Sequence, residues 1–194
     1  KRGTLKEFRD AQHWLEAQKL PPTLIVAGNH EALVHETHTP KQALWAPWLH
    51  PASQYPGLSC LNADNVLLIG VNTARPSPPF MATGAIGPAP LEQLGQCLRD
   101  ARAKGLCRVV LLHHPAGHDL VVWRKRLEDL HALENLLQRE GAELVLHGHS
   151  HHATSCHIAG TDIPVISSSS ASHAPGQEDS AAGWNHIGIQ KTPS

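Results

Sequence analysis

The chain has 194 residues, of which 41% are apolar and 17% are charged, and its formal net charge at pH 7 is -1. This length suffices for one domain with a sizeable hydrophobic core, while the near-zero charge excludes a general basic surface for nucleic acid or membrane lipids. Five tryptophans, two phenylalanines and one tyrosine are too few for a platform that stacks the bases of a single strand.

Four cysteines are scattered along the chain and form no C-x-x-C pair: Cys60, Cys97, Cys107 and Cys156. Isolated cysteines of this kind favour reduced thiols and therefore a cytoplasmic protein. No apolar run approaches the roughly 18 residues that a membrane-spanning helix needs, so we expect no transmembrane segment.

The first predicted element is a helix over residues 4–19, which Thr4 and Glu7 open with a T-x-x-E capping box. The apolar run 23–27 then predicts a short buried strand. This strand leads directly into Gly28-Asn29-His30.

Residues 31–64 have no steady hydrophobic period and predict a long excursion over one edge of the domain, with a helical turn near 41–49. Its histidines either face a substrate or lie in a solvated loop: His35, His38 and His50. Residues 66–73 predict another buried strand. The proline- and glycine-rich residues 75–90 predict a second irregular loop.

A helix followed by a strand is predicted twice more. Helix 90–104 leads to strand 108–112, which ends in His113-His114-Pro115, and helix 127–140 leads to strand 144–146, which ends in His147-Gly148. Beyond these, short strands joined by antiparallel turns are predicted at 155–159, 164–168 and 184–189.

Helix, short turn and buried strand therefore occur in this order three times, over residues 4–27, 90–112 and 127–146. Such alternation implies an α/β fold with parallel strands and crossover helices. Ligand sites of these sheets lie at the carboxyl ends of the strands. We therefore expect the three polar motifs that follow the strands to meet at one edge of the sheet.

The side chains expected at this edge are one asparagine and five histidines: Asn29, His30, His113, His114, His149 and His151. Amide oxygen and neutral imidazole suit Zn, Mn, Fe, Ni or Co better than Mg or Ca alone. A closed structural zinc site would usually include cysteine, which these motifs lack. In an extended segment, His149 and His151 would point the same way, so we expect both to face a metal.

Three motifs, GNHE at 28–31, LLHHP at 111–115 and LHGHSH at 146–151, resemble motifs three to five of the calcineurin-like metallophosphoesterases. Within that superfamily the chain is most similar to small bacterial enzymes of the type that includes class III cyclic nucleotide phosphodiesterases. The resemblance implies a two-sheet α/β/β/α sandwich, here lacking its first strands. It also implies a small phosphorylated substrate and no nucleic acid polymer as partner.

Residue roles follow from this resemblance. Asn29, His113 and His149 match ligands of the second metal, and His151 matches a ligand of the first. His30 matches the histidine that contacts the phosphate and assists the leaving group. Two further residues are substrate-binding candidates with open alternatives: His114 contacts substrate or merely packs, and Arg124 attracts a phosphate or lies at a solvated helix start.

The family's first two motifs, D-x-H and G-D, do not occur in the expected places. Asp10 falls inside the first predicted helix, and Asp64 lies between the third and fourth motifs. We therefore expect residues 1–194 to be a single, N-terminally incomplete phosphoesterase domain. The first two motifs supply the bridging carboxylate that holds two cations close together, so we expect this chain alone to hold at most one weakly bound metal.

Two functions remain open on the sequence. The first is a metal-dependent phosphoesterase with two divalent ions per intact site, which hydrolyses a phosphomonoester or phosphodiester with an activated hydroxide. The second is a catalytically impaired fragment or remnant that binds one metal or a phosphate without turnover. A structural zinc domain is disfavoured by the lack of cysteine in the motifs.

Overall fold

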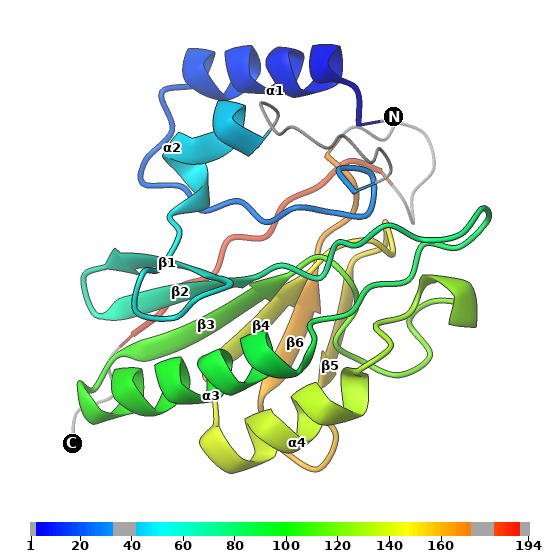
Figure 1. Cartoon of the computed structure of the whole chain (residues 1–194). Coiled ribbons are helices and arrows are strands. Elements are labelled where there is room, and N and C mark those ends of the chain that lie inside the picture. The colour runs from blue at the N-terminus through cyan, green and yellow to red at the C-terminus, as the bar shows by residue number, and fades with distance from the viewer. Residues whose placement is uncertain (1–2, 33–41, 172–180, 191–194) are drawn as a thin grey trace.

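The computed structural model of the protein describes residues 3–32, 42–171 and 181–190. Six strands form one sheet (Figure 1): Leu58–Ala63 (β1), Val66–Val71 (β2), Cys107–Leu112 (β3), Leu144–His147 (β4), Thr154–His157 (β5) and Pro164–Ser167 (β6). The helices are Leu5–Ala17 (α1), Ala46–Leu49 (α2), Pro88–Ala103 (α3) and Leu130–Glu140 (α4), with 3-10 turns at Gln42–Trp45 (η1) and Trp123–Lys125 (η2).

The strand order is β1-β2-β3-β4-β6-β5. β2, β3, β4 and β6 run parallel, while β1 and β5 pair antiparallel at the two edges. α3 connects β2 to β3 and α4 connects β3 to β4, so the predicted crossover helices and the α/β class are confirmed. In the part of the chain that the structure describes, all six strands join one sheet rather than the two sheets that the family resemblance implies.

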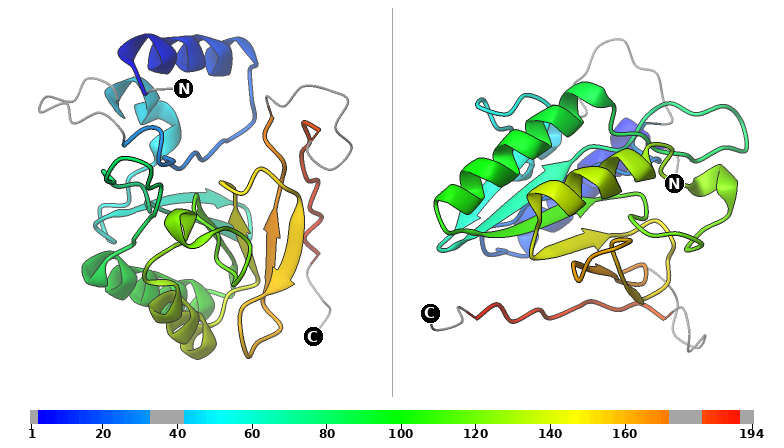
Figure 2. Two further views of the ribbon diagram at one scale, coloured as in Figure 1. Left: turned by 90° about the vertical axis from the view of Figure 1, so that its right-hand side faces the viewer. Right: turned by 90° about the horizontal axis from the view of Figure 1, so that it is seen from below.

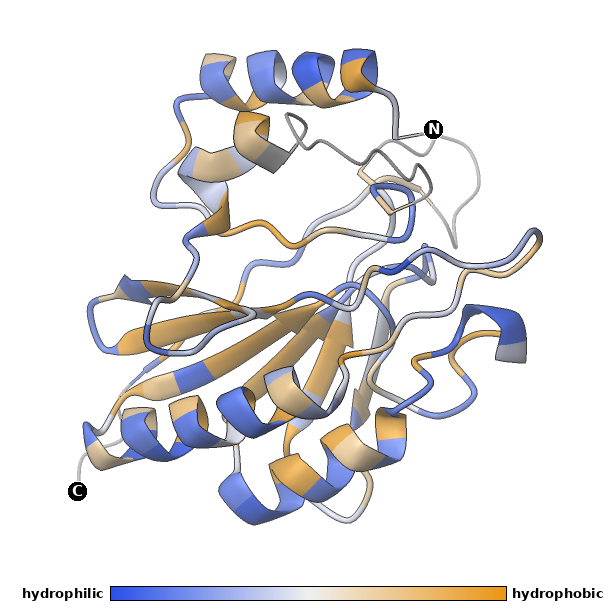
Figure 3. Ribbon diagram, viewed as in Figure 1, coloured by the Kyte–Doolittle hydropathy of each residue, from blue (hydrophilic) through white to orange (hydrophobic). Residues whose placement is uncertain are grey.

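The core lies between the sheet and helices α3 and α4, which cover the same face (Figures 1 and 2). Leu94 and Leu98 of α3 and Leu133 and Leu137 of α4 are completely buried there. Figure 3 shows that the strands are mostly apolar and that apolar and polar residues alternate along the helices. Burial of each such leucine stabilises the fold by roughly 1.5–3 kcal/mol, so this layer fixes the positions of β3 and β4.

Helix α1 packs away from this layer. Thr4 caps it, and the reciprocal bonds of Thr4 with Glu7 confirm the predicted capping box. Phe8 is the buried side chain of α1, and its ring stacks on that of Trp45 with centroids 4.5 Å apart. Accordingly, α1 packs on η1, which continues into α2, and η1 and α2 together form the helical turn predicted near 41–49 (Figure 1).

Residues 23–27 were predicted as a buried strand, and this prediction is wrong in the described structure. The segment is extended but belongs to no ladder, because the Ile25 amide donates to the carbonyl oxygen of Trp48, which lies in α2. Residues 184–189 were also predicted as a strand and form none. They lie on the side of the sheet opposite α3 and α4 (Figure 2), where the Asn185 side chain, Nδ2, donates to the Ser167 carbonyl.

Strand β1 was not predicted, since residues 31–64 had been interpreted as irregular. Asp64-Asn65 is a two-residue turn between β1 and β2, and Asp64 has a φ of 53°. Aspartate and asparagine favour such turns because they tolerate positive φ. The Asp64-Asn65 pair directly before the apolar run at residue 66 is therefore the sequence feature that would have predicted the β1–β2 hairpin.

Helix α4 begins three residues later than predicted. Leu127 pairs with Gly84 in an isolated bridge, and the Asp129 carboxylate accepts hydrogen bonds from the amides of Ile86 and Gly87. The segment before Leu130 is therefore fastened to the loop at residues 84–87 instead of joining the helix. None of the helices in the described residues has the length and apolarity needed to cross a bilayer.

Candidate metal centre

The three polar motifs meet at the carboxyl ends of the parallel strands, as predicted. His113 follows β3, and His149 comes two residues after the end of β4. The Nε2 atom of His113 lies 3.0 Å from Oδ1 of Asn29 and 3.0 Å from Nδ1 of His149. One imidazole therefore joins all three motifs.

The turn that carries Asn29 is held against His113 by close backbone contact. A Cβ placed on Gly28 would lie 2.7 Å from the His113 ring, so only glycine fits here without a shift. The Gly28 amide donates to Oε2 of Glu31 over 2.8 Å, and the Glu31 amide donates to the Gly28 carbonyl. The sequence pattern alone predicts no role for Glu31, although this residue belongs to the GNHE motif.

The segment 148–152 is not extended, which corrects the expectation that His149 and His151 point the same way. Both have left-handed backbones, with φ of 66° and 61°. The chain turns sharply because the Ser150 amide donates to the Gly148 carbonyl over 2.7 Å. As a result His149 is buried against His113, whereas His151 is exposed. Left-handed conformations are costly for residues other than glycine, and they gather at functional sites.

His114 lies beside this group but is engaged with the protein through both ring nitrogens. Nδ1 is 2.7 Å from Oγ1 of Thr73 and Nε2 is 3.2 Å from the carbonyl oxygen of Ala82. The side chain is completely buried, and a Cβ on Gly84 would collide with its ring. These contacts favour the packing alternative for His114 over substrate contact. The centroid of the His114 ring is 4.6 Å from that of the His149 ring, so the two rings pack against each other.

The imidazoles of this centre are held in the neutral form. Burial, and then the neighbouring imidazoles, lower the pKa of His113 to about 3, and burial likewise lowers the pKa of His149 to about 3. Burial also lowers the pKa of His114 to about 4. At neutral pH a nitrogen lone pair is therefore available on His113 and His149, and metal binding requires this form.

The donor atoms of Asn29, His113 and His149 fit a divalent transition metal. An ion with six ligands at about 2.1 Å spaces neighbouring ligand atoms about 3.0 Å apart, which matches both distances from His113. The nitrogen of His149 in this arrangement is Nδ1; its other ring nitrogen, Nε2, is buried and has no hydrogen-bond partner in the described residues. In the described residues no third histidine, cysteine or carboxylate brings a ligand atom within 4.8 Å of both His113 and His149.

The remaining predicted site residues lie around this group. His30 is half-buried, and both His30 and His151 are close enough for their charge to lower the pKa of His113 and His149. Arg124 is exposed on η2, where its carbonyl accepts from the Ala82 amide. The charge of its neighbour Lys125 adds to the effect of burial in lowering the pKa of His149.

Other sequence candidates are not at this centre. Asp10 pairs with Lys6 on the exposed face of α1, and Asp64 lies in the β1–β2 turn. The Nε2 atom of the His50 ring lies 3.0 Å from the carbonyl oxygen of Thr23, so His50 contacts the segment 23–27. His35 and His38 lie outside the described residues.

A family model described as calcineurin-like phosphoesterase matches residues 3–153. Among solved structures, the chain is similar to a dimetal phosphatase from Danio rerio, with a TM-score of 0.59 and 16% identity over 82% of this chain and 66% of that one. It also matches a Staphylococcus aureus protein described as a 5'-nucleotidase in complex with alpha-ketoglutarate, with a TM-score of 0.49 and 14% identity over 82% of this chain and 34% of that one. The chain thus spans less than two thirds of either structure. No curated protein sequence matches it.

Proposed function

The chain belongs to the calcineurin-like phosphoesterase family, and from that premise we propose that it acts in the metal-dependent hydrolysis of a small phosphomonoester or phosphodiester. The observation that carries this proposal is the approach of Asn29 and His149 to the same nitrogen of His113, each at 3.0 Å. Divalent ions bound at this centre, two in an intact site and drawn from Mn, Fe, Zn, Ni or Co, would supply positive charge that lowers the pKa of a water and offsets the charge of the phosphoryl oxygens.

In this proposal the residues of the chain have distinct tasks. Asn29, His113 and His149 hold one ion, and the exposed His151 belongs to the ligands of the other. The half-buried His30 contacts the phosphate and supports the departing oxygen as a general acid. Lys125, whose charge reaches His149, attracts the anionic substrate together with Arg124, the residue before it on the same exposed turn.

A second candidate is a chain that binds one ion or a phosphate without turnover. It is favoured by one observation: in the described residues, no carboxylate joins the donor atoms of Asn29, His113 and His149. A bridging carboxylate is what offsets the repulsion between two cations. With a single ion, the charge available to neutralise a phosphoryl group is halved.

The proposed location is the cytoplasm. All four cysteines are free, which suits a reducing compartment.

Hydrolysis of an aryl phosphodiester and an aryl phosphomonoester, measured with and without Mn²⁺, tests the proposal. We expect metal-dependent turnover, and we expect His149→Ala to lower it by about 100-fold or more, beyond the loss that follows removal of an outer-shell partner. His152→Ala is the matched control, since His152 is exposed and its hydrogen bonds in the described residues are made by its backbone amide and carbonyl.

The outcomes separate the two candidates. Mn²⁺ binding that depends on His149 without any turnover supports the second candidate. Turnover or binding that is the same in His149→Ala and wild type contradicts both.

A further inference from the structure

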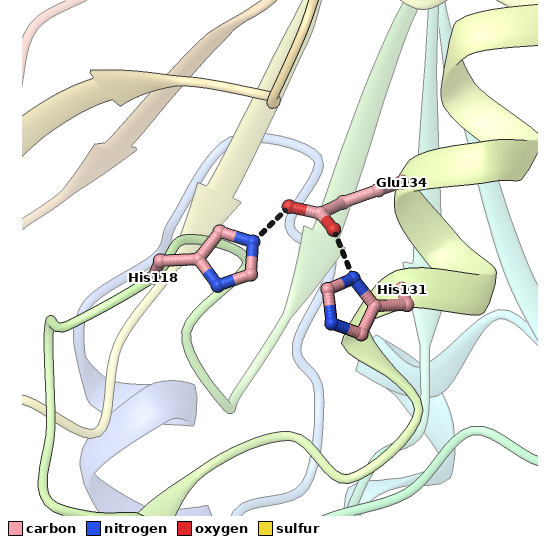
Figure 4. A group of neighbouring side chains, drawn as sticks. All are labelled: His118, His131 and Glu134. Atoms are coloured by element: carbon pink, nitrogen blue, oxygen red, sulfur yellow. Dashed lines mark hydrogen bonds and ion pairs between the residues drawn. The ribbon is translucent and has the colours of Figure 1, made fainter.

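A second group of possible ligands lies outside the candidate metal centre and shares no residue with it. His118 comes from the connection after β3, and His131 and Glu134 lie one turn apart on α4 (Figure 4). Nε2 of His118 is 2.7 Å from Oε1 of Glu134, and Nδ1 of His131 is 3.0 Å from Oε2. Figure 4 shows both rings turned toward the one carboxylate.

Glu134 is the unusual member of this group. It is only 4% exposed, and burial of a carboxylate is costly unless it is paired and hydrogen-bonded. Its ion-pair partners in the described residues are the two imidazoles, with no lysine or arginine. Although Oε1 lies close to Nε2 of His118, it has no hydrogen-bond partner in the described residues.

We propose that His118, His131 and Glu134 bind a divalent ion of the zinc class, separate from the ions of the phosphoesterase centre. Two imidazole nitrogens and one carboxylate oxygen are a ligand set that zinc accepts, with water in the fourth position. The ligand atoms all lie within 4.8 Å of one another. Tetrahedral zinc with bonds of about 2.0–2.1 Å spaces its ligand atoms about 3.4 Å apart.

The ligand atoms must rearrange to reach that spacing. The two close contacts, of 2.7 and 3.0 Å, would open by roughly 0.4–0.7 Å, and a pair of ligand atoms at the 4.8 Å limit would close by roughly 1.4 Å. The rings are free to move, since His118 and His131 are 49% and 85% exposed at the side chain. Glu134 is fixed by its burial on α4, so the carboxylate provides the rigid anchor and the two histidines adjust to the ion.

The ion would fasten the connection between β3 and α4 to the first turns of α4. That connection begins with His113 and also carries Lys125, both placed near the phosphoesterase centre. Because an ion that binds only the folded state stabilises it by mass action, zinc occupancy should raise the thermal stability of the protein even where hydrolysis is absent.

Zinc titration of the chelator-treated full chain tests this inference by binding rather than by activity. Four proteins are compared: the wild type, the double variant His118→Ala/His131→Ala, the single variant His149→Ala, and the triple variant that combines all three substitutions. Calorimetry gives the zinc stoichiometry, and thermal unfolding gives the stability. We expect the double substitution to remove one zinc equivalent per chain in both the wild-type and the His149→Ala backgrounds. We also expect the zinc-dependent rise in unfolding temperature to shrink with it.

The controls use exposed histidines of neither site. His152→Ala with His157→Ala removes two imidazoles and should leave the zinc stoichiometry unchanged. Circular dichroism verifies that each variant is folded. We expect the variants to fold, because the side chains of His118 and His131 are exposed.

An unchanged stoichiometry in the double variant would overturn the proposal and leave a histidine–glutamate network without an ion. Loss of turnover in the His149→Ala test has no bearing on this result, so the two proposals fail separately. Cobalt substituted in the His149→Ala variant gives a second readout, since absorption bands that vanish on His131→Ala support the assignment and bands that persist contradict it.

Discussion

Nε2 of His113 and Nδ1 of His149 lie 3.0 Å apart although 36 residues separate them in the chain. The contact follows from the parallel pairing of β3 and β4, in which Leu111 is opposite Leu146. Both strands therefore end at the same level, and the residues after them are brought together. The Gly148 amide also donates to the His113 carbonyl over 3.1 Å, which continues the contact past the ends of the strands.

Substitution of Gly28 should disturb this centre without unfolding the protein. In Gly28→Ala the new methyl group would lie 2.7 Å from the His113 ring, so the ring or the turn must move. We expect the dissociation constant for Mn²⁺ or Zn²⁺ to rise about 10–100-fold, as when the support of a ligand is removed.

Calorimetric metal titration checks this, with Gly188→Ala as the matched control. A Cβ at Gly188 meets nothing within 4 Å, so that variant should bind as the wild type does. Equal affinity of the two variants would show that the turn at Gly28 does not set the position of His113.

Loss of the Thr73 hydroxyl should destabilise the fold. Thr73→Val keeps the shape of the side chain but leaves the buried Nδ1 of His114 without its 2.7 Å partner. An unsatisfied buried polar group costs about 1–3 kcal/mol, and denaturant unfolding should show a loss of that size. Ser155→Ala, at an exposed position of β5, should change the free energy of unfolding by no more than about 0.5 kcal/mol. A Thr73→Val variant as stable as Ser155→Ala would contradict the structural role assigned to His114.

Tyr55 should ionise only at strongly alkaline pH. Burial, and then its hydrogen bond to Asp100, raise the pKa of Tyr55 to about 12 from an ordinary value near 10. Because the folded-state pKa lies above the unfolded one, this contribution to stability is full below about pH 10 and is lost as the pH rises from about 10 to about 12. Tyr55 is the one tyrosine in the sequence, so tyrosinate absorbance follows it directly. A midpoint near 10 in the folded protein would contradict the prediction, and Tyr55→Phe should abolish the signal.

Removal of the Glu143 side chain should lower the free energy of unfolding more than removal of an exposed charged side chain does. Arg108 is buried, and it donates to Glu143 from its amide, its Nε and its Nη2 over 2.6, 3.0 and 2.6 Å. Glu143→Ala leaves the guanidinium with the Glu140 carbonyl as partner, and we expect a loss of about 1–3 kcal/mol in the free energy of unfolding.

The control is Asp10→Ala, which breaks an exposed pair with Lys6 on α1. Exposed pairs of this kind contribute little because solvent screens them, so no measurable loss is expected. Similar stability of the two variants would show that the Arg108 network adds nothing to the fold.

Much of the fold could be predicted because local patterns and global packing agree in it. The capping box at Thr4, the amphipathic periods of α3 and α4 and the apolar runs of β2, β3 and β4 each specify an element on their own. The prediction failed where the secondary structure of a segment depends on which distant backbone it can bond. Residues 23–27 have the composition of a strand, but a strand requires a neighbouring backbone, and Ile25 bonds α2 instead.

The sequence by itself determined that two histidine-bearing motifs, at His113 and His149, follow strands of a parallel α/β sheet, because periodicity and chain order fix which ends of the strands coincide. The motif of Asn29 was also predicted to follow a strand, but the segment before it forms none. Only the tertiary structure decided how each side chain is used. The left-handed turn at residues 149–151 buries His149 and exposes His151, Thr73 and Ala82 engage both nitrogens of His114, and the burial of Glu134 between His118 and His131 joins residues that no motif connects. These outcomes depend on contacts between distant segments and on the desolvation they cause, which the order of residues along the chain does not specify.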